Sequence, residues 1–132
     1  MPNVVLDTNI LVSGLLSPQG SSARILSALI DGRITCFFSE DIIGEYEAVL
    51  SRDRFGFPPK EVERLIESIK KIGQPIAPRN STHPMTDESD RMFYDAAKAA
   101  FAYLITGNAK HFPDETFVIT PARFADEMLG GG

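Results

Sequence analysis

The sequence lacks several features that define whole classes of protein. Its 132 residues include one cysteine and two histidines. The single cysteine, Cys36, excludes an internal disulfide and a cluster of thiolate metal ligands, and its place in an apolar run favours a small buried side chain. No apolar run approaches the ~20 residues that span a bilayer, and residues 1–3 show no basic or apolar leader. We therefore expect a cytoplasmic protein without a membrane segment.

An excess of basic residues is also missing. Lysine and arginine total 13 against 18 aspartate and glutamate residues, which gives a net charge of −5. This balance argues against a globally basic nucleic-acid-binding protein. It is compatible with an enzyme that holds cations in an acidic site, because bound divalent ions invert the local charge. The length suits one domain, which can bury about two-thirds of its extended surface without disulfides or a structural metal.

Short apolar segments alternate with amphipathic ones along the chain. This alternation predicts a three-layer α/β/α fold, in which helices cover both faces of a central, mainly parallel sheet of about four or five strands. We expect strands at residues 4–6, 34–38, 103–106 and 117–119, and helices at 10–16, 21–30, 39–50, 58–72, 87–101 and from 121 onward. Residues 73–86 contain three prolines and predict a loop with at most a short extended piece. One domain is expected over residues 1–129, followed by a glycine tail at 130–132 that should fray.

Several acidic residues fall at informative places in this pattern. Ligands of open parallel sheets bind beyond the carboxyl ends of the strands. Asp7 follows the first strand and Asn108 follows the strand at 103–106, so both are expected at that edge. Helical periodicity puts Glu45 at the edge of one buried stripe and Asp90 on the inward face of another helix. The same periodicity puts Asp95 on the opposite, solvated face.

Three carboxylates placed in this way suggest a bound cation. Asp7, Glu45 and Asp90 are costly to bury together, because buried carboxylates lose hydration and repel one another. Mg²⁺ and Mn²⁺ take oxygen ligands and leave positions for a phosphate and an attacking water. The two histidines, His83 and His111, form no zinc motif and are expected to be structural or solvated.

Each of these residues also has an ordinary structural explanation. Asp7 suits a turn between a strand and a helix, and Glu45 suits a helix surface. Asp90 suits the start of a helix, where a negative charge complements the dipole, and Asn108 suits a turn or a cap. The residue types alone leave both explanations open.

Five segments, taken in order, match the pattern of a known family. They are VVLDTNILVS at 4–13, SEDIIGEY at 39–46, DESDRMF at 87–93, LITGN at 104–108 and TPARF at 120–124. These segments resemble, in turn, the first strand, the second-acid helix, the third-acid segment, the strand that ends in a Thr-Gly-Asp or Thr-Gly-Asn turn, and the closing helix of the PIN-domain nucleases. The similarity extends over nearly the whole chain, and five weak motifs in the right order make a strong signal.

The resemblance implies a Mg²⁺- or Mn²⁺-dependent ribonuclease with a PIN-like fold. Asp7, Glu45 and Asp90 would hold the metal and position the attacking water. Asn108 stands where many members of the family have a fourth acid, and its uncharged amide disfavours a tightly held second metal. The side chains expected to support these ligands or to contact a phosphate are Thr8, Asn9 and Thr106.

The resemblance also implies partners. The most similar subgroup consists of small prokaryotic PIN proteins described as toxins of toxin–antitoxin pairs. An RNA substrate, an antitoxin protein and a homodimer are therefore expected. An acidic pocket is a natural target for a basic antitoxin side chain, which would occupy the place of the metal.

The same residues argue for or against other functions. A PIN-like module that binds RNA or protein without cleavage is favoured by Asn108 and disfavoured by the three acids. A phosphatase of the haloacid-dehalogenase type requires a second aspartate two residues after Asp7, where this chain has Asn9. A receiver-type signalling domain requires more acids beside its first strand than this chain has.

Overall fold

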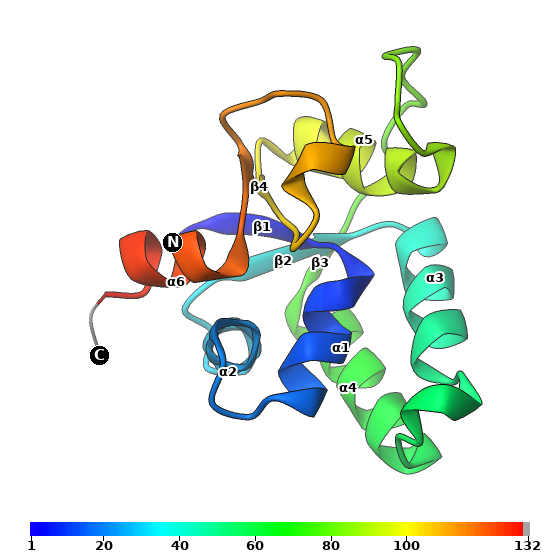
Figure 1. Cartoon of the computed structure of the whole chain (residues 1–132), viewed down its shortest axis with the longest axis vertical. Coiled ribbons are helices and arrows are strands. Elements are labelled where there is room, and N and C mark those ends of the chain that lie inside the picture. The colour runs from blue at the N-terminus through cyan, green and yellow to red at the C-terminus, as the bar shows by residue number, and fades with distance from the viewer. Residues whose placement is uncertain (131–132) are drawn as a thin grey trace.

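The computed structural model describes residues 1–130, and within them five strands form a parallel sheet in the order β3-β2-β1-β4-β5 (Figure 1). The predicted α/β/α class is confirmed. Gly131 and Gly132 of the expected tail lie outside the described residues. The strands are β1 (Asn3–Leu6), β2 (Thr35–Phe38), β3 (Gln74–Pro75), β4 (Tyr103–Ile105) and β5 (Val118–Ile119). The helices are α1 (Thr8–Leu16), α2 (Ser21–Ile30), α3 (Glu40–Leu50), α4 (Pro59–Ile72), α5 (Arg91–Ala100) and α6 (Pro121–Met128), with 3₁₀ turns η1 (Asp53–Phe55), η2 (Glu88–Asp90) and η3 (Ala109–His111).

Helices cover both faces of the sheet (Figure 1). On one face, α5 packs against β1, β2 and β4, and on the other face α4 packs against β2. α2 lies on the side of α4 and packs against α1, α4 and α6. α3 contacts α1, α4 and α5, so it lies at the end of the sheet toward which the strands run. This end is where the candidate site forms.

The central strand β1 is buried on both sides. Val4, Val5 and Leu6 are completely inaccessible, as expected for a short apolar strand in the middle of a parallel sheet. β1 pairs with β2 on one side and with β4 on the other, where Leu6 stands opposite Ile105. The register brings the residues that follow β1 and β4 side by side.

The proline-rich segment 73–86 supplies the edge strand of the sheet. Gln74 and Pro75 pair with Phe37 and Phe38 of β2, and the Ile76 N–H donates to the Phe38 carbonyl at 2.8 Å. Proline is compatible with an edge strand because its missing N–H faces no further strand. The short extended piece anticipated within this loop is therefore a strand of the sheet.

The helices are short and several are capped by side chains. The Ser39 hydroxyl accepts the Ile42 N–H at 3.2 Å, and the Thr120 hydroxyl accepts the Arg123 N–H at 3.3 Å. The longest helix, α4, has 14 residues. Within residues 1–130, no helix combines the length and the apolar character needed to cross a membrane.

The prediction for Asp95 was wrong. Periodicity assigned it to a solvated face of α5, yet only 5 % of this residue is exposed. The loop before η2 folds back over that side of the helix, where the Ser81 N–H donates to Asp95 Oδ2 at 3.0 Å. Helical periodicity predicts which residues share a face of a helix, and it does not predict where a distant loop packs.

Candidate active site at the carboxyl end of the sheet

Asp7 occupies the first position after β1, at the N-cap of α1. Its backbone N–H donates to the Ile105 carbonyl at 3.0 Å, which extends the pairing of β1 with β4 by one residue. Only 8 % of the residue is exposed. Burial raises the pKa of the Asp7 carboxyl, because water no longer stabilises the charge. The backbone N–H groups of Thr8 and Asn9 lower the pKa of Asp7 and so offset part of the effect of burial. The Asp7 side chain makes no capping hydrogen bond to α1.

A buried threonine beyond the neighbouring strand holds the Asp7 carboxylate. Thr106 follows β4 directly, is fully buried, and donates its hydroxyl to Asp7 Oδ2 at 2.6 Å. The same hydroxyl accepts the Asn108 N–H at 3.0 Å. Thr106 thus connects the turn at 107–108 to the carboxylate. The Asn108 side chain itself is exposed and makes no capping bond to η3.

α3 brings Glu45 to the same edge. Glu45 is half-buried, and its charge adds to the larger effect of burial in raising the pKa of Asp7. The next residue, Tyr46, is fully buried and donates its hydroxyl to the Leu6 carbonyl at 2.6 Å. Burial raises the pKa of Tyr46 well above its usual value, so the hydroxyl remains a donor. This bond fixes α3 to the last residue of β1, directly before Asp7.

Asp90 comes from the face of the sheet that α5 covers. It ends η2 and occupies the N-cap of α5. Burial raises the pKa of Asp90 to about 6, and the charges of Asp7 and Asp87 add to this effect, with a smaller contribution from Glu45. Within residues 1–130 its carboxylate makes no hydrogen bond, so the backbone around it determines its position.

The fold therefore brings the three predicted acids together. Asp7, Glu45 and Asp90 lie close enough for their charges to act on one another. In the described part of the chain, however, no three acidic, histidine or cysteine side chains stand at the spacing of metal ligands. The acids form an electrostatic cluster and not a closed cage. This arrangement suits Mg²⁺, which often binds through one or two carboxylates and keeps several of its waters.

Two further oxygens beside Asp7 are buried without a partner in residues 1–130. They are Thr8 Oγ1 and Asn9 Oδ1, and the Asn9 amide lies next to Gly107 across the end of the sheet. A buried oxygen without a hydrogen bond costs about 1–3 kcal/mol, which a cation with its bound waters can offset. Carboxylate, hydroxyl and amide oxygens together are the donors that a hard divalent cation prefers. The residues present thus fit Mg²⁺ or Mn²⁺.

His111 ends η3 and is exposed, and it lies within electrostatic reach of two acids. Hydrogen bonds from Ser89 lower the pKa of Asp87, with a smaller contribution from protonated His111, which also opposes the rise in the pKa of Asp90. The sequence held no local signal for this proximity, because η2 and η3 approach only through the packing of the sheet. The sequence also held no signal for the hydrogen bond from Tyr46 to the Leu6 carbonyl, because the pattern identified Tyr46 only as a member of an apolar stripe.

An acidic groove of about 560 Å³ lies beside the cluster, between the start of α3 and the loop before η2. Its lining includes four carboxylates, those of Glu40, Asp41, Glu88 and Asp95. Arg91 is the one basic residue in the lining, and it is bound to Glu88. The groove therefore presents mostly negative charge.

Comparison with known proteins agrees with this architecture. Residues 3–110 match the family described as PIN domain, a span that includes Asp7, Glu45, Asp90 and Asn108. The chain belongs to the PIN-domain family.

Two relatives extend the comparison. The chain is 25 % identical over 108 residues to an uncharacterized protein of Methanocaldococcus jannaschii, an alignment that covers 80 % of this chain and 70 % of that protein. It is also similar to a chain in the crystal structure of VapBC2 from Rickettsia felis, which was solved with a DNA fragment from the VapBC2 promoter bound. That match has a TM-score of 0.58 and 18 % identity, and it covers 89 % of this chain and 96 % of the other. At this identity the likeness shows a shared fold.

Proposed function

We propose that the protein is a Mg²⁺- or Mn²⁺-dependent endoribonuclease that hydrolyses RNA phosphodiester bonds in the cytoplasm as the toxin of a toxin–antitoxin pair. The observation that carries the proposal is the convergence of Asp7, Glu45 and Asp90 from three separate elements at the carboxyl end of the sheet. Placing like charges together raises the free energy of the metal-free fold. An arrangement that costs stability in this way is typical of a functional site.

Each residue has a defined part in the proposed site. Asp7, Glu45 and Asp90 would hold the cation, which supplies an activated water and stabilises the leaving oxygen when it is bound. Thr106 holds the Asp7 carboxylate through its hydroxyl. Thr8 Oγ1 and Asn9 Oδ1, which have no partner within residues 1–130, can accept hydrogen bonds from the cation's waters, and the Thr8 hydroxyl can also donate to a phosphate. Asn108 can orient a water through its amide, and it adds no charge for a second cation.

The proposal of an antitoxin partner is supported by the charge around the site. The acidic cluster and the acidic groove beside it attract basic side chains, and a guanidinium forms strong, charge-assisted bonds with carboxylates. VapBC2, whose chain shares this fold, is a complex bound to promoter DNA. We infer that a basic side chain of a partner protein occupies the place of the cation among Asp7, Glu45 and Asp90.

A second candidate is a PIN module that binds RNA or protein without cleaving it. Asn108 and the absence of ligand spacing among the acids of residues 1–130 favour this alternative. The two functions differ in one measurable property, which is binding of a divalent cation by the acid cluster.

The experiment is a calorimetric titration of Mn²⁺ into the wild type and into Asp7→Asn, followed by incubation of both with a mixed RNA pool. Binding and Mn²⁺-dependent cleavage that are both lost in the variant would support the nuclease. Binding without cleavage would indicate a narrow substrate requirement or the missing charge at Asn108. No binding to the wild type would favour the inert module.

Asp90→Asn provides an independent check. We expect it to remain folded and to lose cleavage by at least about two orders of magnitude, because removing a ligand disrupts both the cation and the water. Circular dichroism would report the fold and gel analysis of the RNA would report cleavage. Activity that survives in both Asp7→Asn and Asp90→Asn would contradict the assignment of the site.

A further inference from the structure

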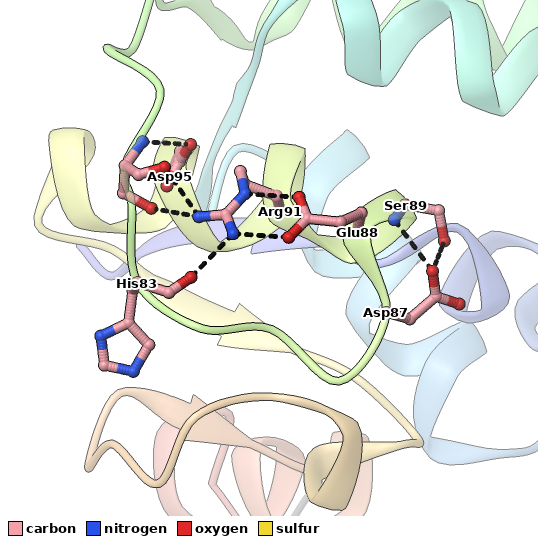
Figure 2. A network of polar contacts seen from close by, with 7 residues as sticks. His83, Asp87, Glu88, Ser89, Arg91 and Asp95 are labelled. Carbon is pink, nitrogen blue, oxygen red and sulfur yellow. Dashed lines mark hydrogen bonds and ion pairs between the residues drawn. The ribbon is translucent and has the colours of Figure 1, made fainter.

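One arginine fastens the loop before η2 to the helix that follows it. Arg91 is the first residue of α5, and its side chain is 17 % exposed. Its Nε and Nη2 donate to the two carboxylate oxygens of Glu88, each at 2.7 Å. Nη1 donates to the carbonyl and the hydroxyl of Ser81, both at 2.8 Å, and Nη2 also donates to the His83 carbonyl at 2.7 Å (Figure 2). These five bonds match the five N–H groups of a guanidinium.

A second contact fixes the same loop one helical turn further on. The Ser81 N–H donates to Asp95 Oδ2 at 3.0 Å, so Ser81 bonds through its N–H, its carbonyl and its hydroxyl to one face of α5 (Figure 2). This contact explains why Asp95 is buried. If the loop left the helix, Asp95 Oδ2 and the guanidinium of Arg91 would lose their hydrogen bonds to Ser81.

The other end of the loop is closed by a turn. Asp87 Oδ1 accepts the Ser89 N–H at 2.9 Å and the Ser89 hydroxyl at 2.8 Å, which starts η2 (Figure 2). Glu88, inside this turn, is the carboxylate that binds Arg91. Asp90 lies between Glu88 and Arg91 in the chain, so the residues on both sides of it are held by the same ion pair.

The guanidinium of Arg91 is directed to the loop and not to the Asp90 carboxylate. All five of its N–H groups donate to Glu88, Ser81 and His83. The Asp90 carboxylate has no hydrogen bond of its own within residues 1–130. Its direction therefore depends on how firmly η2 is held.

We propose that Arg91 is a positioning residue: by binding Glu88, Ser81 and His83 together, it holds Asp90 in the direction of Asp7 that cation binding requires. The inference rests on the proposed function. It assigns Arg91 a role in orienting a metal ligand, although Arg91 is itself a cation and would not bind the metal. Arg91 touches no cation and no substrate in this role.

Arg91→Lys tests this role, because lysine keeps the charge and loses the planar fork. An ammonium has three donors and cannot replace five bonds. We expect faster hydrogen exchange at the Ser81 and Ser89 amides, an unchanged circular dichroism spectrum and a loss of Mn²⁺ affinity of about tenfold, the usual result of disturbing a residue that orients a ligand. The matched control is Arg123→Lys, since Arg123 binds Glu127 through an exposed ion pair on α6.

A double-mutant cycle separates positioning from a general loss of stability. If Arg91 acts through Asp90, Arg91→Lys should weaken Mn²⁺ binding in the wild type and have a smaller effect in an Asp90→Glu background, which keeps a carboxylate ligand but changes its reach. Equal effects in the two backgrounds would overturn the inference. So would unchanged Mn²⁺ affinity in Arg91→Lys together with a raised KM for RNA, because that result would make Arg91 a phosphate contact.

The outcomes also distinguish this inference from the proposed function. A wild type that binds no Mn²⁺ would overturn the nuclease proposal and the positioning role with it. A wild type that binds Mn²⁺ and an Arg91→Lys variant that binds it equally well would overturn the positioning role alone.

Discussion

The Thr106 hydroxyl is a donor and an acceptor at once, and both of its partners belong to the candidate site. It donates to the buried Asp7 carboxylate and accepts the Asn108 N–H. Thr106→Val keeps the shape of the side chain and removes both bonds. We expect this variant to lose about 1–3 kcal/mol of stability to urea at pH 7, because a buried carboxylate then lacks its donor.

Thr106→Ser is the matched control for this prediction. It retains the hydroxyl and removes only a methyl group, so it should lose less stability than the valine variant. A valine variant as stable as the wild type would contradict the prediction, because it would show that the hydroxyl of Thr106 does not stabilise this edge of the sheet.

The raised pKa of Asp90 makes the stability of the metal-free protein depend on pH. Its pKa is about 6 in the fold against an ordinary value of 3.8, so the folded state binds a proton more readily than the unfolded chain. The free energy of unfolding should therefore increase as the pH falls from 7 through 6 toward 4. Asp7 shifts in the same direction.

Thermal unfolding in a chelator at pH 7 and pH 5 measures this dependence. Asp90→Asn should unfold at a higher temperature than the wild type at pH 7 and should show a smaller change between the two pH values. Asp126→Asn, which removes an exposed carboxylate on α6, serves as the control. A pH dependence that is the same in Asp90→Asn and the wild type would contradict the prediction.

The positions of the acids could be predicted from the sequence where local rules apply. The edge that holds Asp7 follows from a parallel sheet, and helical periodicity puts Glu45 at the edge of a buried stripe. Asp90 was expected in the first turn of a helix, and it lies instead at the end of η2, directly before α5. Asp95 and His111 could not be placed in this way. Their surroundings are created by the loop before η2 and by η3, whose paths depend on contacts between segments that are distant in sequence.

At the scale of the element, α3 is the helix whose placement matters most to the site. Tyr46 joins it to the Leu6 carbonyl at the end of β1 by a buried bond of 2.6 Å. Tyr46→Phe should cost about 1–3 kcal/mol of stability, since the buried carbonyl loses its donor. It should also weaken Mn²⁺ binding, because the neighbouring residue Glu45 is then less firmly placed.

Tyr103→Phe is a suitable control in the same urea and calorimetric measurements. The Tyr103 ring packs edge-on against Phe124, and its hydroxyl makes no hydrogen bond within the described residues. Its removal should change stability by less than about 0.5 kcal/mol. Tyr46→Phe with wild-type stability and Mn²⁺ affinity would show that α3 is held by its apolar packing alone.

The elements themselves were largely predictable, because most of them depend on local pattern. α4 begins at a Pro-Pro pair and continues its apolar stripe to Ile72, as expected. β3 was the hardest to anticipate. Its two residues have no alternation to detect, and they form a strand only because β2 offers a free edge.

At the scale of the whole molecule, the resemblance to the PIN-domain toxins predicts a homodimer. Leu16, Ile30, Ile72 and Phe101 are large apolar residues with substantial exposure, and Phe101 is 93 % exposed. We expect light scattering at tens of micromolar to give the mass of a dimer. A monomer under these conditions would contradict the prediction.

Phe101→Asn refines this test. Phe101 has φ of 51°, a left-handed conformation that asparagine adopts more readily than phenylalanine. The variant should therefore remain as stable as the wild type while it removes the most exposed apolar ring. A shift toward the monomer would locate the interface at the end of α5, and an unchanged mass would locate it elsewhere.

The bond between Asp7 and Thr106 joins residues 99 positions apart in the chain. β4, one of the two neighbours of β1 in the sheet, therefore comes from a distant part of the chain. Pairings of such long range form slowly, because the entropy of closing the intervening chain is lost before the contact stabilises it. The acids of the proposed site therefore come together only after this slow pairing has formed. Under the proposed function, a chain in which β1 and β4 have not yet paired is a harmless polypeptide.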